Sequence, residues 1–284
     1  MTNEKLDLVF HGADKRPSLY DVIYPKNGAK LPLLIFCHGF KGFKDWGHFP
    51  ILCRTLANSG RVVVPFNFSH NGVGLQNKFD FTDLEAFAKN NYLRELEDIS
   101  RLLDHLEVEE DLAARIDFND ISIIGHSRGG SMALLAGTND PRIKRMITLA
   151  AVSDLFSRLA EDEQLIDWEE KGVRYILNGR TKQQMPMNFQ FVRSLRNHKD
   201  SLNLRTKLIN SSKPILILHG EQDQTVDVSQ SYELKEWCMN GEHQEIAGAN
   251  HTFGGTHPYP KEQLPETSEK ALKAIIDFLE RHAG

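Results

Sequence analysis

Residues 121–130, ISIIGHSRGG, decide the fold of this chain. The first four form a short apolar run that is typical of a strand buried on both faces. Gly125, Ser127 and Gly129 then fit the pattern G-x-S-x-G, and a helical pattern continues to about Ala136. The pattern alone is common, but its place between a strand and a helix is the setting of a nucleophile elbow. These residues therefore predict Ser127 as an exposed nucleophile.

The residue types of this turn have a physical reason. A sharp turn from strand to helix holds the serine in a strained conformation, and side chains in place of the flanking glycines would clash there. The N-terminus of the helix favours negative charge close to the serine. An acyl-transfer intermediate also needs preorganised donors for its oxyanion, and the backbone N–H of Arg128 is one candidate.

Short apolar runs alternate with helical patterns along most of the chain. This alternation predicts an α/β fold, with a mostly parallel sheet covered by helices on both faces. The expected strands cover residues 5–10, 17–24, 33–37, 61–64, 121–124, 146–152, 214–218 and 243–247. The expected helices cover residues 48–59, 84–107, 127–136, 228–239 and 266–281.

Residues 153–212 interrupt this alternation. The stretch has no strand-like run, shows a helical periodicity and includes a loop near residues 178–187. A structureless stretch of that length is uncommon inside a compact domain. We therefore expect a single domain over residues 1–284 with a helical insertion at about 153–212.

A serine nucleophile needs a general base, which an acid in turn orients. In this kind of fold the chain order is Ser, then Asp or Glu, then His. Asp223 and His251 each follow an expected strand, which places both at the carboxyl edge of the sheet, where ligands bind. His219 ends a strand and is expected to be a turn or packing residue. Asp227 and His257 remain open as rivals for the acid and the base.

A glycine-rich loop follows the apolar run 33–37. It reads HGFKG at residues 38–42, in the position from which this architecture supplies a second oxyanion donor. The backbone N–H of Phe40 is the candidate for that donor. We expect the side chains of Lys41 and Lys44 to be solvated.

Composition and charge narrow the function classes. The chain is 40% hydrophobic and 26% charged, which is ordinary for a globular protein. Its net charge of −5 is spread without a basic tract, so nucleic acid is not an expected partner. No apolar run approaches the roughly 18 residues that span a bilayer, so no membrane association is expected. The sequence does not indicate an oligomeric state.

The cysteines and the N-terminus bear on the compartment. Cys37, Cys53 and Cys238 are odd in number and far apart, which fits neither a disulfide framework nor a zinc site. The first ten residues lack the apolar core of a secretory signal. We expect reduced thiols in a cytoplasmic protein that uses no cofactor and no metal.

Four motifs together resemble the α/β-hydrolase superfamily of serine hydrolases: HGF at 38–40, GHSRGG at 125–130, HGEQD at 219–223 and GANH at 248–251. The resemblance extends over residues 19–279. It is strongest to bacterial dienelactone-hydrolase-like proteins, cinnamoyl or feruloyl esterases and prolyl-oligopeptidase-type peptidase domains. It implies an eight-stranded, mostly parallel sheet, a catalytic triad at its carboxyl edge, and a helical cap that corresponds to the insertion.

Two positions depart from those relatives. Dienelactone hydrolases proper have a cysteine where this chain has Ser127. The acid in related proteins often precedes a Val-Pro pair, whereas Val226 is followed here by Asp227. The second departure keeps Asp227 open as the acid.

The sequence therefore predicts a hydrolase of small-molecule carboxylic esters with small or aromatic acyl groups. Ser127 would attack the carbonyl, His251 would accept the proton and Asp223 would orient the imidazole. One alternative is a peptidase or amidase with the same triad, for which the acidic run 161–163 could bind a substrate amine. Another is a catalytically silent binding protein on the same fold.

Overall fold

The computed structural model describes residues 2–26, 30–157, 159 and 162–283. Eight strands form one sheet in the order β1-β2-β4-β3-β5-β6-β9-β10. β2 runs antiparallel to β1 and to β4, and the remaining neighbours are parallel. The strands are β1 (Thr2–His11), β2 (Pro17–Pro25), β3 (Leu31–Cys37), β4 (Val62–Phe66), β5 (Ile116–His126), β6 (Ile143–Leu149), β9 (Ile215–Gly220) and β10 (Gly241–Ile246). The predicted mostly parallel sheet of eight strands is confirmed.

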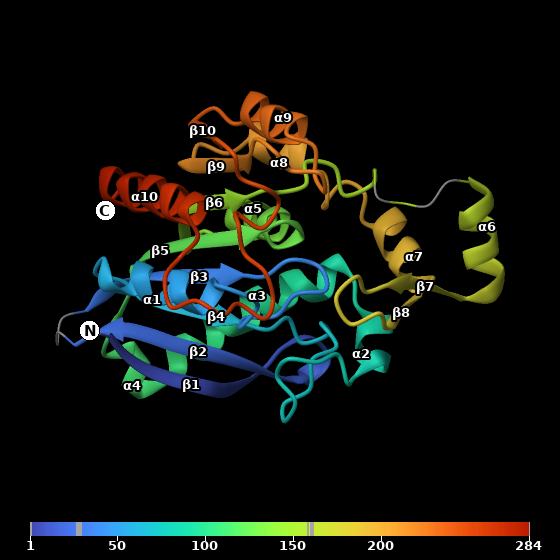
Figure 1. Ribbon diagram of the computed structural model, residues 1–284, viewed down its shortest axis with the longest axis horizontal. Helices are drawn as coiled ribbons and strands as arrows, with labels where there is room; N and C mark the ends of the chain where they lie inside the picture. Colours follow the sequence, from blue (N-terminus) through green and yellow to red (C-terminus); the bar gives the residue numbers. More distant parts are fainter. Residues whose placement is uncertain (1, 27–29, 158, 160–161, 284) are drawn as a thin grey trace.

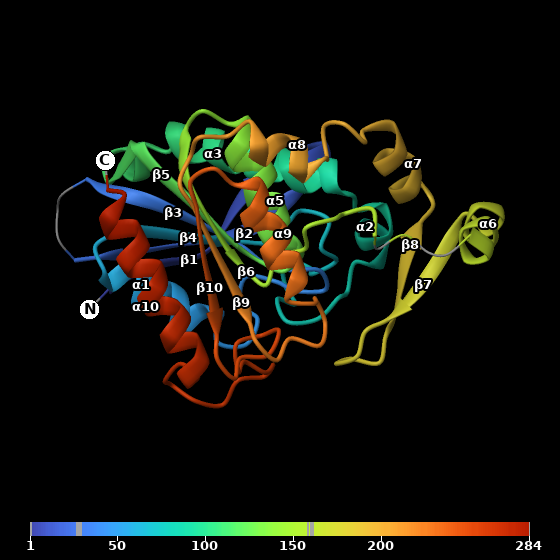
Figure 2. The same ribbon diagram turned by 90° about the horizontal axis from the view of Figure 1, so that it is seen from above.

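Helices cover both faces of this sheet (Figures 1 and 2). On one face, α1 (Phe49–Asn58) packs against α10 (Glu266–Arg281). The other face is covered by α3 (Tyr92–Val108), α5 (Arg128–Asn139) and α9 (Ser229–Trp237). Each face buries its own apolar layer, as expected for strands that are apolar on both sides. Short helices are η1 (Ala13–Lys15), α2 (Leu84–Lys89), α4 (Glu110–Ala113) and α8 (Leu204–Ile209).

The helix predicted over residues 84–107 is interrupted, because α2 and α3 are separate helices. Asn90 ends α2 with an extended backbone, at φ −62° and ψ 148°. Asn91 begins α3, and its side chain accepts a hydrogen bond from the Arg94 N–H. Asparagine favours such caps because its side chain replaces missing backbone hydrogen bonds.

The insertion at 153–212 is not wholly helical, which corrects the prediction. Besides α6 (Asp162–Lys171) and α7 (Gln190–Asn197), it contains an antiparallel hairpin of β7 (Val173–Leu177) and β8 (Gln184–Asn188). Arg174 interrupts the apolar residues of β7, and β8 contains Pro186, which is disfavoured inside strands, so neither segment has a clear strand signal. In both ribbon views the hairpin and α6 lie at the end of the molecule opposite the two termini.

Candidate active site

Ser127 occupies the tight turn that its sequence predicts. It lies between β5 and α5 with φ 54° and ψ −124°, a backbone conformation that non-glycine residues adopt at an energetic cost. A Cβ on Gly125 would lie 2.1 Å from the Gly129 oxygen, and one on Gly129 would lie 2.3 Å from the His38 oxygen. The two flanking glycines are therefore required by close backbone approach.

His251 and Asp223 are brought together from two loops. The distance from His251 Nδ1 to Asp223 Oδ2 is 2.8 Å, and the Asp223 side chain is fully buried. The other carboxylate oxygen accepts hydrogen bonds from the N–H groups of Thr225 and Val226. Burial favours the neutral acid, but these backbone bonds and the hydrogen bonds of His219 and His251 outweigh it and lower the pKa of Asp223. The acid is therefore an anion beside His251.

The rival residues have other partners. Asp227 is exposed and accepts a hydrogen bond from the Ser229 N–H at 2.9 Å. His257 Nδ1 accepts a hydrogen bond from the Gly47 N–H at 2.9 Å. Neither of them pairs with the other or with Ser127 in the described residues. The geometry thus favours Asp223 and His251 over both rivals.

Two further histidines lie near the site: His219, which the sequence predicts to be a turn or packing residue, and His126, to which it assigns no role. His219 Nε2 lies 3.3 Å from Asp223 Oδ2 and 2.9 Å from the Val226 carbonyl oxygen, so Asp223 has a second imidazole beside it. His126 Nε2 donates to the His251 carbonyl oxygen at 2.8 Å. Burial lowers the pKa of His126 to about 3, so this imidazole is neutral. Both histidines lie within motifs of the sequence, His126 in GHSRGG and His219 in HGEQD, but their contacts with Asp223 and His251 depend on how the loops fold.

Ser127 and His251 line one cavity of about 190 Å³, which we call the His251 cavity. Gly39 and Phe40 line it from the loop after β3. A Cβ on Gly39 would lie 3.1 Å from the Ser127 Cβ, so this loop packs closely against the serine. Phe40 thus lines the same cavity as Ser127, and Arg128 follows Ser127 in the chain. The role of their backbone N–H groups as oxyanion donors stays a prediction.

A second cavity of about 280 Å³, the Trp168 cavity, also borders Ser127 and lies under the β7–β8 hairpin. Most of its lining side chains are apolar, and three are cationic: Lys41, Arg128 and Arg174. The lining residues are Phe40, Lys41, Tyr92, Ser127, Arg128, Val152, Leu155, Trp168, Arg174, Ile176, Met187 and Phe191. The two cavities share Phe40, Lys41 and Ser127, which gives the serine access to a predominantly apolar pocket.

The Arg128 side chain helps to build the Trp168 cavity. Its guanidinium lies 4.0 Å from the centre of the Phe40 ring and 4.9 Å from that of Tyr92. It also pairs with the buried Glu95 carboxylate at 3.2 Å. Burial raises the pKa of Glu95, although the Arg128 charge opposes this. The charge of Arg128 is therefore balanced inside the protein.

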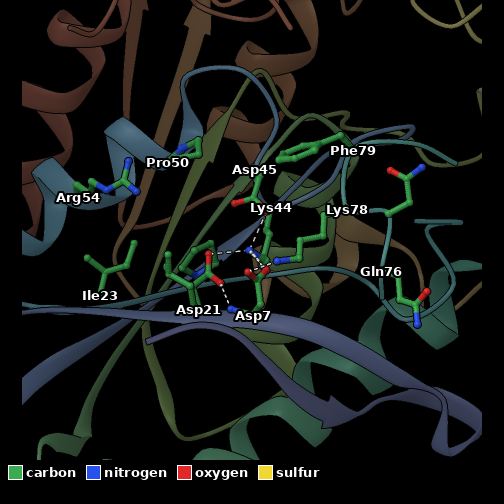
Figure 3. Close-up of a pocket in the computed structure, with 13 residues that line it drawn as sticks. Asp7, Asp21, Ile23, Lys44, Asp45, Pro50, Arg54, Gln76, Lys78 and Phe79 are labelled. Atoms are coloured by element: carbon green, nitrogen blue, oxygen red, sulfur yellow. Dashed lines mark hydrogen bonds and ion pairs between the residues drawn. The ribbon is translucent and has the colours of Figure 1, made fainter. Parts of the chain in front are cut away.

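Lys44 is buried rather than solvated, which corrects the prediction. Its ammonium contacts Asp21 and Asp45 at 2.8 Å each and Asp7 at 3.2 Å. Figure 3 shows this group of charges beside a cavity of about 430 Å³ formed with Lys78 and other residues. Neither Ser127 nor His251 lines that cavity. The sequence could not show it because three separate segments supply the carboxylates.

Three further expectations concern metals, thiols and membranes. Within the described ranges, no group of three or more His, Cys, Asp or Glu residues is arranged to hold a metal ion. The three cysteines are buried and free, as predicted. None of the helices formed by the described residues is long and apolar enough to cross a bilayer.

A strained serine between strand and helix, at the carboxyl edge of a mostly parallel eight-stranded sheet, defines an α/β hydrolase. A family model described as BD-FAE matches residues 87–238, just over half of the chain, and the protein belongs to this family. The resemblance to esterase-like α/β hydrolases is thereby confirmed.

Individual proteins with similar sequences or structures bear related names. The chain is 21% identical to 2-hydroxymuconate semialdehyde hydrolase of Pseudomonas sp. (strain CF600), with 80% of this chain and 81% of that protein aligned. It is 28% identical to the uncharacterized peptidase YtmA of Bacillus subtilis (strain 168), over 80% and 82% of the two chains. The structure of Est1E from Butyrivibrio proteoclasticus with ferulic acid bound is similar, with a TM-score of 0.72 at 20% identity over 96% and 98% of the chains.

Proposed function

We propose that this protein is a serine esterase that cleaves carboxylic esters through an acyl-enzyme on Ser127. One observation carries the proposal. A serine held in a strained turn lines the same cavity as a histidine whose Nδ1 is hydrogen-bonded to a buried aspartate. This is the arrangement by which a weak nucleophile is activated by a base that an acid orients.

The proposed reaction assigns one residue or group to each step. His251 accepts the Ser127 Oγ proton as Oγ attacks the ester carbonyl, and the N–H groups of Phe40 and Arg128 bind the oxyanion. The imidazolium then protonates the leaving alcohol oxygen as the C–O bond breaks. Water attacks the acyl-enzyme with His251 again as the base, and the acid product leaves. Asp223 keeps Nδ1 protonated and stabilises the imidazolium.

The Trp168 cavity supports a preference for compact acyl groups. Its volume of about 280 Å³ lies just below the usual range of ligand pockets, about 300 to 1,000 Å³. Aromatic and aliphatic side chains form most of its wall, among them Trp168, Phe191 and Met187. We therefore expect short or aromatic acyl groups to be accepted and long-chain lipids to be poor substrates.

The peptidase alternative has weaker support. An aminopeptidase needs carboxylates to bind the substrate amine, but none of the described residues lining either Ser127 cavity is acidic. Of the acidic run once considered for this role, Glu161 lies outside the described residues and Glu163 is exposed on α6. A catalytically silent binding protein would have no function for the strained Ser127 or for the hydrogen-bonded pair of His251 and Asp223.

A substrate series tests the proposal. We expect kcat/KM for p-nitrophenyl esters, from acetyl to palmitoyl, to be highest for short acyl groups, with aryl esters comparable. Ser127→Ala should lower kcat by about 10⁴-fold or more while the circular-dichroism spectrum stays unchanged. A maximum at lauroyl or longer would contradict the compact pocket. A preference for amino-acid amides over every ester would favour the peptidase, and retention of about a tenth of the activity in Ser127→Ala would exclude this nucleophile.

A further inference from the structure

The Trp168 cavity has an unbalanced positive charge. Lys41, Arg128 and Arg174 all line it, and no described lining residue is acidic. Glu95 balances Arg128, but no carboxylate in the described part of the chain pairs with Lys41 or Arg174. The cavity thus carries positive charge although the chain as a whole has a net charge of −5.

Arg174 is held toward the cavity by its place in the hairpin. Side chains alternate along β7, and those of Tyr175 and Leu177 are 61% and 50% exposed. Arg174 and Ile176 therefore face the other side, where both line the cavity. The guanidinium lies 4.9 Å from the centre of the Trp168 ring. The opposing residue on β8 is Met187, which also lines the cavity.

The supporting wall is itself fixed. The Trp168 indole N–H donates to the Met187 carbonyl oxygen at 2.8 Å, so the ring on which Arg174 stacks has a defined position. A guanidinium that stacks on an indole keeps its N–H groups free for a planar acceptor. The arrangement is therefore suited to a carboxylate, which guanidinium groups bind through two parallel hydrogen bonds.

Lys41 adds a second cation to the lining of the cavity. It belongs to the loop that carries Phe40, and its ammonium donates to the Leu177 carbonyl oxygen at 3.3 Å. This contact brings it next to the end of β7. Burial and the nearby Arg128 charge lower the pKa of Lys41, as expected for a cation that has no anion beside it.

We propose that the Trp168 cavity binds an acyl group with a second, ionised carboxylate, which Arg174 and Lys41 neutralise while its ester carbonyl lies at Ser127. The substrates would be monoesters of compact, preferably aromatic, dicarboxylic acids. The apolar wall would contact the body of the acyl group, and the two cations would bind its far end. This inference rests on the proposed esterase function and specifies its substrate class.

Two esters of equal shape test the inference. They are the p-nitrophenyl esters of 4-carboxybenzoic acid and of 4-carbamoylbenzoic acid, which differ in charge at the far end of the ring. We expect wild-type kcat/KM to favour the anionic ester by about tenfold or more, since charge-assisted hydrogen bonds are the stronger ones. The preference should diminish with added salt, because screening weakens attraction between charges.

Substitutions assign the preference to its residues. Arg174→Gln and Lys41→Gln should each reduce the ratio of the two kcat/KM values, and Arg174→Glu should reverse it. Arg193→Gln is the matched control, because Arg193 also lies in the insertion and stacks on an aromatic ring, Phe189, but is exposed and lines neither cavity. It should keep the wild-type ratio.

The outcomes separate this inference from the proposed function. A ratio near one in the wild type, or a ratio that Arg174→Glu leaves unchanged, overturns the inference; if p-nitrophenyl acetate is still cleaved in a Ser127-dependent manner, the esterase proposal stands. If no p-nitrophenyl ester is cleaved in a Ser127-dependent manner, the esterase proposal fails and the inference fails with it.

Discussion

Replacing Asp223 with asparagine tests the assignment of the acid, because neighbouring hydrogen-bond donors determine which side of the new amide holds its oxygen and which its NH₂ group. Two backbone N–H groups, of Thr225 and Val226, donate to one carboxylate oxygen at 2.8 and 3.0 Å. An asparagine oxygen would remain with these donors. Its NH₂ group would then take the place of Oδ2, 2.8 Å from His251 Nδ1 and 3.3 Å from His219 Nε2.

The consequence for His251 follows from hydrogen-bond chemistry. An NH₂ group only donates, so it would favour the tautomer of His251 that has no proton on Nδ1. The proton would then lie on Nε2, the nitrogen that must accept the Ser127 proton. We expect Asp223→Asn to lower kcat by about 10⁴-fold, as in the general triad template, which corresponds to about 5.4 kcal/mol of activation free energy.

Saturation kinetics with p-nitrophenyl acetate near neutral pH measure this loss. A melting curve shows whether the variant is folded. Asp227→Asn is the matched control, because Asp227 is exposed and accepts hydrogen bonds from Ser229 rather than from His251. We expect its kcat to stay within about twofold of the wild type. A loss of less than about tenfold in folded Asp223→Asn, or a larger loss in Asp227→Asn, would refute the assignment.

Three further variants test other parts of the site. His251→Ala should abolish ester turnover, whereas His257→Ala should keep most of it; the opposite ranking of kcat would transfer the role of the base. Gly129→Ala places a Cβ 2.3 Å from a backbone oxygen and should destabilise the fold by about 3 kcal/mol, so an unchanged denaturation midpoint would contradict the close packing. Arg128→Met leaves the buried Glu95 carboxylate without its cation and with the Asn90 amide as its donor, and should cost about 3–5 kcal/mol near pH 8. Burial raises the pKa of Glu95 in the folded protein above its ordinary 4.5, so the free energy of unfolding falls as the pH rises above 4.5. The difference in unfolding free energy between Arg128→Met and the wild type should therefore be smaller near pH 5 than near pH 8. An equal difference at both pH values would count against the buried pair.

The strained turn at Ser127 could be predicted from the sequence because its determinants are local. The apolar strand, the two glycines and the following helix are contiguous, so the turn at Ser127 is encoded by about ten residues. The proximity of Asp223 and His251 could be predicted for a related reason. Each follows a strand, and parallel strands bring their carboxyl ends to the same edge of the sheet. The sequence favoured Asp223 and His251 but kept Asp227 and His257 open, because the distances between loops that distinguish them depend on the fold.

Other features depend on contacts between distant segments. Lys44 looked like a solvated residue of a loop, but its ammonium lies among carboxylates from β1, β2 and its own loop. The β7–β8 hairpin was missed because Arg174 interrupts the apolar pattern of a short strand. Its half-buried side chain lines a cavity, which the sequence alone does not show.

Covalent labelling is the most direct test of the central claim that Ser127 is the nucleophile of an esterase. Diethyl p-nitrophenyl phosphate reacts with an activated serine hydroxyl, which displaces nitrophenolate and leaves a diethylphosphoryl group on the oxygen. Intact-mass and peptide-mapping spectrometry should find one adduct per chain, on Ser127, with no adduct in Ser127→Ala and much slower labelling in His251→Ala. An adduct on another residue, or continued ester hydrolysis by protein that carries the label on Ser127, would contradict the account.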